Sequence, residues 1–319
     1  AMTQAVGLRG RTRWLAPLLA LLALAAFGLA ASILGEVAFA ALPVWMTLAA
    51  MALYLLAHVL RALRLGIIAG PLLGASVRTT AALHFVCAPL VTLIPMKLGE
   101  LVRLHQLWLI GRRLSGAVIA LLIDRMLDAT MLLGLLGWFA LIGHPAIDQA
   151  HMVLVLTAAA VGLAGLVLVL GPSMLASLQR YVLIHHQSPA LLRGLPMIDL
   201  LRRGADEGRV LVRRQGAPLL VISASIWMLE LAAAAIFTTA VMDPGLRNPG
   251  LLLLARATQE WLIATSAGVD PAFAASAASG ILVLLAVWPA AIWIYIRRIG
   301  AEPQRLRRPP NLPEAHHGA

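Results

Sequence analysis

The sequence PMKLGELVR, residues 95–103, is followed after an apolar gap by DRMLD, residues 124–128. Both stretches concentrate charged side chains in a chain that is 61% hydrophobic and only 12% charged. Several other runs in the chain are more apolar and exceed the roughly 18 residues that suggest a membrane-spanning helix. Ionisable groups at membrane depth are costly and usually functional. The sequence therefore predicts an all-α polytopic membrane protein with a charged site among its helices.

The charge of the chain fits a membrane protein better than a nucleic-acid-binding protein. The formal net charge is +11, and the 25 basic residues are one Lys and 24 Arg, clustered beside the apolar runs. Such clusters set the orientation of membrane helices, so no nucleic-acid partner is expected. Cys87 is the single cysteine, which excludes an internal disulfide.

The apolar runs predict about six full spans and two re-entrant segments. The full spans are expected at residues 14–34, 39–60, 115–142, 152–170, 218–242 and 272–296. The re-entrant segments are 77–94, which His84 and Pro89 interrupt, and 251–267. With this assignment the large Arg clusters share one face, and both termini are cytoplasmic. Eight full crossings are the alternative, which moves Arg112, Arg113 and the large Arg-rich loop to the outer face.

The order of these segments predicts an inverted repeat. Two spans, a re-entrant segment and a third span occur twice, at about residues 14–142 and 152–298, within one transmembrane domain. Inverted repeats with broken helices are a recurrent plan of secondary transporters. The remaining parts are expected in the cytoplasm: an N-terminal segment (1–13), an Arg-rich polar loop (about 179–215) and a disordered tail (299–319). Residues 98–110 are either the second limb of the first re-entrant hairpin or a helix lying on the membrane surface.

The segment LIPMKLGELVRLHQLWLIGRRLSGAVIALLIDRMLDATMLL, residues 93–133, resembles the signature of the lysylphosphatidylglycerol synthase transmembrane-region family, also called flippase-like proteins. The match departs from the family in the second half, where Pro249-Gly250 lacks the Gly-rich turn that usually precedes a Glu. The resemblance implies movement of an anionic lipid or a polyprenyl-phosphate-linked amphiphile between leaflets. The aminoacyl transfer of two-domain members belongs to a separate soluble domain, so no enzymatic activity is expected here.

One set of residues is predicted to bind the anionic headgroup. Arg offers phosphate a planar fork and Lys offers it a point charge, while Gly allows the backbone to approach closely. The predicted set is Arg61, Arg64, Lys97, Gly99, Glu100 and Arg103. Arg61 and Arg64 lie three residues apart at the predicted cytoplasmic boundary of the second span. Ordinary positive-inside flanking is the alternative interpretation of that pair.

A second set is predicted to form an intramembrane charge network or to carry a coupled proton. Its members are Asp124, Arg125, Asp128, Arg256 and Glu260. Asp124 and Asp128 share a helix face, and Arg125 points about 100° away from Asp124. Because an unpaired charge is costly in a low dielectric, we expect Asp124, Arg125 and Asp128 to pair with one another or with Lys97, Glu100 and Arg103. A network that only locks the helices together is the alternative.

Other polar residues carry no recognisable chemistry. His58, His84 and His105 lack metal-ligand spacing, and no nucleotide-binding motif is present, so no cofactor or metal is expected. The serines lack the surroundings of a nucleophile. We therefore predict a lipid transporter of the cell inner membrane, with membrane lipids and an anionic headgroup as partners. A second copy of the chain or an envelope-biosynthesis enzyme is left open as a protein partner, and a non-transporting scaffold or lipid-binding accessory protein is the alternative function.

Overall fold

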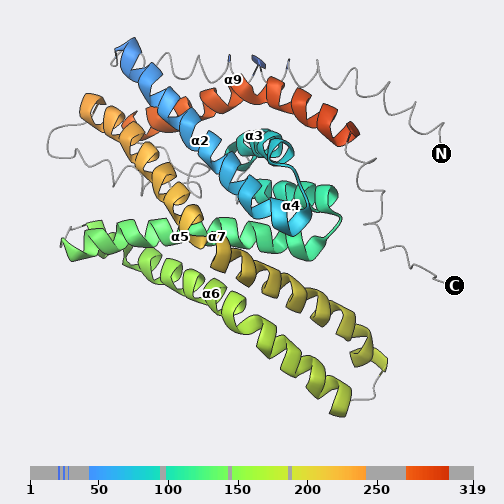
Figure 1. Cartoon of the computed structure of the whole chain (residues 1–319). Helices are drawn as coiled ribbons and strands as arrows, with labels where there is room; N and C mark the ends of the chain where they lie inside the picture. Colours follow the sequence, from blue (N-terminus) through green and yellow to red (C-terminus); the bar gives the residue numbers. More distant parts are fainter. Residues whose placement is uncertain are drawn as a thin grey trace.

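The computed structural model describes residues 43–93, 98–142, 146–185, 189–241 and 271–301, together with positions 21, 24, 25 and 28. All regular structure in these ranges is α-helical (Figure 1). The helices are α2 (Val44–Leu73), α3 (Val77–Leu93), α4 (Leu98–Gly111), α5 (Leu114–Leu141), α6 (Ala146–His185), α7 (Pro189–Val241) and α9 (Pro271–Ala301). The predicted span 14–34 falls outside these ranges except for the four isolated positions, and the predicted re-entrant segment 251–267 lies wholly outside them.

Four candidate membrane spans support the prediction of a membrane protein. They are Val44–Leu73, Leu154–His185, Gly194–Ile236 and Ser279–Arg297, each long and apolar enough to cross a bilayer. The 28 residues of α5 also have sufficient length, but three charged residues interrupt them. The expected six spans and the inverted repeat are not confirmed by the described helices.

Helix α2 lies at the centre of the bundle, and the structure corrects its predicted end. The expected boundary at Leu60 was based on Arg61 and Arg64, but the helix continues through both to Leu73. It ends at Gly74, whose positive φ of 67° favours a residue without a side chain. The apolar core gathers around the second half of α2, with fully buried Leu65 and Ile68 among its members. Arg64 is therefore inside the bundle.

Helices α3 and α4 are short and pack against each other. A Cβ atom on Gly99 would lie 2.5 Å from Cα of Val91, so only glycine allows this approach of α4 to α3. The end of α4 returns to the end of α2, where a Cβ atom on Gly111 would meet the Leu73 side chain at 2.6 Å. Since α3 begins four residues after Leu73, the pair starts and ends in one region. Helix α4 also buries Arg103 and Leu107 against the other helices.

The expected polar loop at residues 179–215 is wrong, because almost all of it is helical. Helix α6 continues to His185, and α7 begins at Pro189 and runs for 53 residues. Arginine is a good helix former, and Asp199 pairs with Arg202 and Arg203 at helical spacing. At 1.5 Å per residue α7 is about 80 Å long, well beyond the roughly 30 Å of a bilayer core. Figure 1 shows the first half of α7 beside α6 and the second half beside α2.

Glycines hold the Arg-rich half of α7 close to its neighbours. A Cβ atom on Gly208 would lie 2.7 Å from the Ile119 side chain of α5 and 3.1 Å from Leu168 of α6. Gly204, one turn earlier, faces Ser115 in the same way. Small residues four apart are a common means of close helix packing in membranes. This contact fixes α5 against α7 and thereby sets which residues of the two helices face α2.

Candidate functional site

The guanidinium of Arg64 is the centre of a buried charge cluster. Its side chain is 0% exposed. Nη2 and Nε lie 2.8 and 2.9 Å from Oδ1 of Asp124, and Nη1 lies 2.8 Å from Oδ1 of Asp128. Nη1 also donates a hydrogen bond to Oγ of Ser223 on α7, at 3.0 Å. One arginine thus connects α2, α5 and α7.

Helix geometry explains how α5 supplies its three charges. Asp124 and Asp128 are one turn apart and both face Arg64, as their spacing predicts. Arg125 points to one side, where Nη2 donates to Oδ2 of Asp124 at 2.9 Å and Nη1 lies 3.4 Å from Oδ2 of Asp128. Its Nη1 also lies 3.4 Å from Oε1 of Glu100. The expected pairing of these residues is confirmed, but Arg125 keeps 44% of its side chain exposed.

Helix α4 adds a second buried arginine and a loosely held carboxylate. Nη2 of Arg103 lies 3.0 Å from Oδ2 of Asp124, so Asp124 contacts three guanidinium groups. Glu100 is 3.8 Å from Arg103 and 3.4 Å from Arg125. Both of its oxygens are buried, and neither accepts a hydrogen bond from any described residue. Glu100 is therefore the least firmly bound acid on this side of the cluster.

A further ion pair joins α2 to the second half of α7. Nη1 of Arg61 lies 2.5 Å from Oε1 of Glu230, whose side chain is 7% exposed. Glu230 and Ser223 are seven residues apart, so they lie on the same face of α7. Glu230 was not predicted as a site residue, because a single acid in an apolar helix has no local partner to reveal it. Its only signal was its presence in an apolar run.

We define the charge cluster as these eight residues: Arg61, Arg64, Arg103, Arg125, Glu100, Asp124, Asp128 and Glu230. Its four guanidinium groups balance its four carboxylates. Asp124 follows the start of α5 by ten residues, or about 15 Å, and Arg64 precedes the end of α2 by nine residues, or about 14 Å. Those two helix ends lie together, since a Cβ atom on Gly116 would meet the carbonyl oxygen of Leu72 at 2.8 Å. Both estimates put the cluster about half a bilayer thickness from the helix ends.

The structure merges the two predicted sets of site residues. Arg61, Arg64, Glu100 and Arg103 were assigned to the headgroup, and Asp124, Arg125 and Asp128 to a separate network, but ion pairs join all of them except Arg61 to one another. Arg61 pairs with Glu230 and acts electrostatically on Asp128. Arg64 does not flank the end of its helix, since α2 continues past it to Leu73, and its side chain is buried in the bundle. Gly99 does allow a close backbone approach, and in the structure this is to α3. Lys97, Arg256 and Glu260 lie outside the described residues.

Two buried histidines next to the cluster were also missed. Nδ1 of His58 on α2 lies 3.2 Å from Nε2 of His84 on α3, and the side chains are 7% and 5% exposed. They are 26 residues apart in the sequence, and only the packing of α2 on α3 brings them together. In the described ranges, no group of three or more His, Cys, Asp or Glu side chains is arranged to hold a metal ion.

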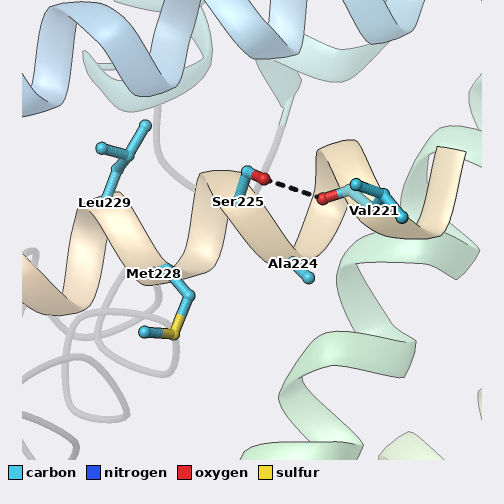
Figure 2. A pocket seen from close by; sticks show the side chains of 5 residues that line it. All are labelled: Val221, Ala224, Ser225, Met228 and Leu229. Carbon is cyan, nitrogen blue, oxygen red and sulfur yellow. Dashed lines mark hydrogen bonds between the residues drawn. The ribbon is translucent and has the colours of Figure 1, made fainter. Parts of the chain in front are cut away.

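A shallow apolar pocket lies on the opposite face of α7 (Figure 2). Val221, Ala224, Ser225, Met228 and Leu229 line it, so a single helix supplies all five. The Ser225 hydroxyl donates to the carbonyl of Val221 at 3.0 Å, which leaves the surface apolar. Since Ser223 and Glu230 point inward, this pocket is separate from the charge cluster.

Comparisons with protein-family models, curated proteins and solved structures found no match.

Proposed function

We propose that the protein is a flippase-like transporter that moves an amphiphile with an anionic headgroup between membrane leaflets. The amphiphile is a phospholipid or a polyprenyl-phosphate-linked carrier. The observation that carries this proposal is the exposure of Arg125, 44%, beside Arg64 and Arg103 at 0% and 5%. A guanidinium that is open on one side near the middle of a membrane requires water or an anion as its partner. Phosphate matches the planar fork of arginine.

The loose contacts of the charge cluster support the same proposal. Arg125 has one close carboxylate contact at 2.9 Å and two at 3.4 Å, so part of its hydrogen-bonding capacity remains available. Glu100 accepts no hydrogen bond from a described residue. A phosphate arriving at Arg125 would displace Glu100 most easily, and Arg103 is the next cation beyond it. Asp124 and Asp128 would stay with Arg64.

The cost of burying charge also favours a functional cluster. Replacing a buried ion pair with well-packed apolar residues is often neutral or stabilising, so buried pairs are weak contributors to stability. Eight charged residues on four helices would therefore be an inefficient way to hold a bundle together. An exchangeable anion site would account for these eight charged residues.

We further propose the finer topology expected from the sequence. The protein would lie in the cell inner membrane with both termini cytoplasmic, six spans and two re-entrant segments. The proximity of the start of α3 and the end of α4 to Leu73 supports the first re-entrant segment. The balance of Arg between the two faces supports the orientation.

The test is reconstitution of the full chain into liposomes that contain fluorescent phosphatidylglycerol or fluorescent phosphatidylcholine. Dithionite added outside bleaches only label in the outer leaflet, so loss of the protected inner fraction reports exchange. We expect wild type to accelerate exchange of the anionic lipid, and Arg125→Gln to slow it without loss of fold. Arg203→Gln is the matched control, since Arg203 is 68% exposed in a surface pair with Asp199. Equal exchange by wild type and a folded Arg125→Gln variant would refute this role of Arg125.

A non-transporting scaffold is the second candidate, and the exact charge balance of the cluster favours it. Four arginines and four acids leave no excess charge to attract a ligand. A scaffold would give no exchange above that of protein-free vesicles, even as wild type. Chemically altered lipid recovered from the same vesicles would instead point to a lipid-modifying enzyme.

A further inference from the structure

His58 and His84 form a pair of facing imidazoles. It is buried between α2 and α3, with the rings 5.4 Å apart between centroids and Nδ1 of one 3.2 Å from Nε2 of the other. Histidine is the side chain whose ordinary titration falls near physiological pH. Chains of buried histidines and carboxylates in membrane proteins often carry protons.

The chemistry of the pair limits it to one additional proton. When both rings are neutral, one nitrogen of the facing pair donates and the other accepts. A proton added to the free nitrogen of the donating ring produces an imidazolium, and the hydrogen bond then becomes charge-assisted. A second proton would place two N–H donors and two positive charges face to face, which would break the bond. The pair is thus a one-proton site.

The surroundings of the pair connect it to the charge cluster. Arg61 on α2 and Arg103 on α4 act electrostatically on both rings, and Asp124 on α5 acts on His84. Helix α7 contributes Glu230 through its ion pair with Arg61. On α3 the nearest titratable group in sequence is Cys87, three residues after His84, which is buried. A charge placed on the pair is therefore felt by Arg103, which is the next cation beyond Arg125 for an incoming anion, and by Arg61.

Electroneutrality then couples the proton to the anion. The cluster is neutral, so an anion entering alone would leave one uncompensated negative charge in a low dielectric, and a proton entering alone would leave one positive charge. If both enter, the site stays neutral. We propose that His58 and His84 together bind the coupling proton, which enters with the anionic headgroup in symport. This inference rests on the proposed function and adds its driving ion.

The experiment measures proton uptake when the purified full chain in detergent binds dihexanoyl phosphatidylglycerol. This phosphodiester does not titrate between pH 5 and pH 8, so a pH effect belongs to the protein. Calorimetry in two buffers of different ionisation enthalpy gives the number of protons taken up. We expect close to one proton per lipid, with affinity rising about tenfold per unit fall in pH where the free pair is neutral.

Variants distinguish the histidines from the carboxylates. The double variant His58→Gln, His84→Gln keeps hydrogen-bonding side chains but has no imidazole left to titrate, so binding should persist while its pH dependence and proton uptake are lost. His105→Gln, on the exposed face of α4, is the control and should behave as wild type.

The possible failures are separable. No binding by wild type at any pH overturns the proposed function, and the coupling with it. Binding without proton uptake by wild type overturns the coupling alone, whether or not the double Gln variant folds. Proton uptake that survives in the folded double Gln variant also overturns the coupling and assigns the proton to a carboxylate such as Glu100.

Discussion

Replacing Arg64 with methionine tests the charge cluster most directly. Methionine keeps an unbranched, flexible side chain, although a shorter one, and removes the charge. Among the described residues, Asp124 would retain Arg103 at 3.0 Å and Arg125 at 2.9 Å, whereas Asp128 would retain only Arg125, at 3.4 Å. Breaking a buried pair by removing one partner costs about 3 to 5 kcal/mol, because the remaining charge is uncompensated. We expect a loss of this size in the free energy of unfolding.

The origin of that loss can be checked with a second substitution. If Asp128 is the acid left uncompensated, Arg64→Met with Asp128→Asn should recover about 1 to 3 kcal/mol relative to the single variant. The assay is reversible unfolding of the purified protein in mixed micelles of increasing SDS content. Arg202→Met is the control, since its pair with Asp199 is on the surface and 40% exposed, and it should change stability by less than about 1 kcal/mol.

A folded Arg64→Met variant within about 1 kcal/mol of wild type would refute the burial or the pairing of Arg64. Equal stability of the single and double variants would leave the burial intact but would show that Asp128 is not the acid that depends on it.

Three further predictions follow from other parts of the structure. Arg125→Gln should lower the free energy of unfolding by less than about 1 kcal/mol, because the Arg125 side chain is 44% exposed, whereas a fully buried arginine would cost about 3 to 5 kcal/mol. If Arg125 contacts phosphate, the same variant should bind dihexanoyl phosphatidylglycerol about tenfold more weakly or worse. Unchanged binding by calorimetry would exclude that contact. Gly99→Ala should destabilise the protein by about 1 to 3 kcal/mol, because the new Cβ atom would lie 2.5 Å from Cα of Val91. Gly162 has nothing within 4 Å of a Cβ atom, so Gly162→Ala should be neutral or stabilising by up to about 1 kcal/mol in the same SDS unfolding assay. A Gly162→Ala variant less stable than Gly99→Ala would contradict the packing of α4 on α3. Cysteine at position 203 in a Cys87→Ala background should react with an impermeant maleimide only after cells are permeabilised, since Arg203 is 68% exposed and belongs to the face expected in the cytoplasm. Labelling in intact cells would support the eight-crossing alternative.

The sequence was sufficient for features that depend on neighbours along the chain. Apolar runs predicted helices over most of α2, α3, α5 and α9, because burial in lipid and helical hydrogen bonding are both local requirements. The shared face of Asp124 and Asp128 and the need for Arg125 to find an acid also followed from helix periodicity and the cost of an unpaired charge. These properties would hold in any packing of the helices.

The sequence was misleading where local composition allowed two structures. Arg61 and Arg64 were expected to mark the end of a span, since arginine usually flanks one. The Arg-rich stretch before Pro218 was expected to be a polar loop for the same reason. Yet arginine is a good helix former, and acids three or four residues away support a helix there. Arg64 is buried because other helices pack around it, and the residues next to it in the sequence do not reveal this.

Tertiary structure alone decided which distant residues meet. The partners of Arg64 are 60 or more residues away, those of Arg61 and His58 are 169 and 26 residues away, and no local pattern announces them. Successive side chains along a helix point about 100° apart around its axis. A shift of one residue in the register of α2 against α5 or α7 would therefore remove these contacts. That register depends on close contacts such as Gly208 on Ile119, and those exist only once the helices are packed. Charge content is therefore a property of the sequence, while the balance of four arginines against four acids is a property of the fold.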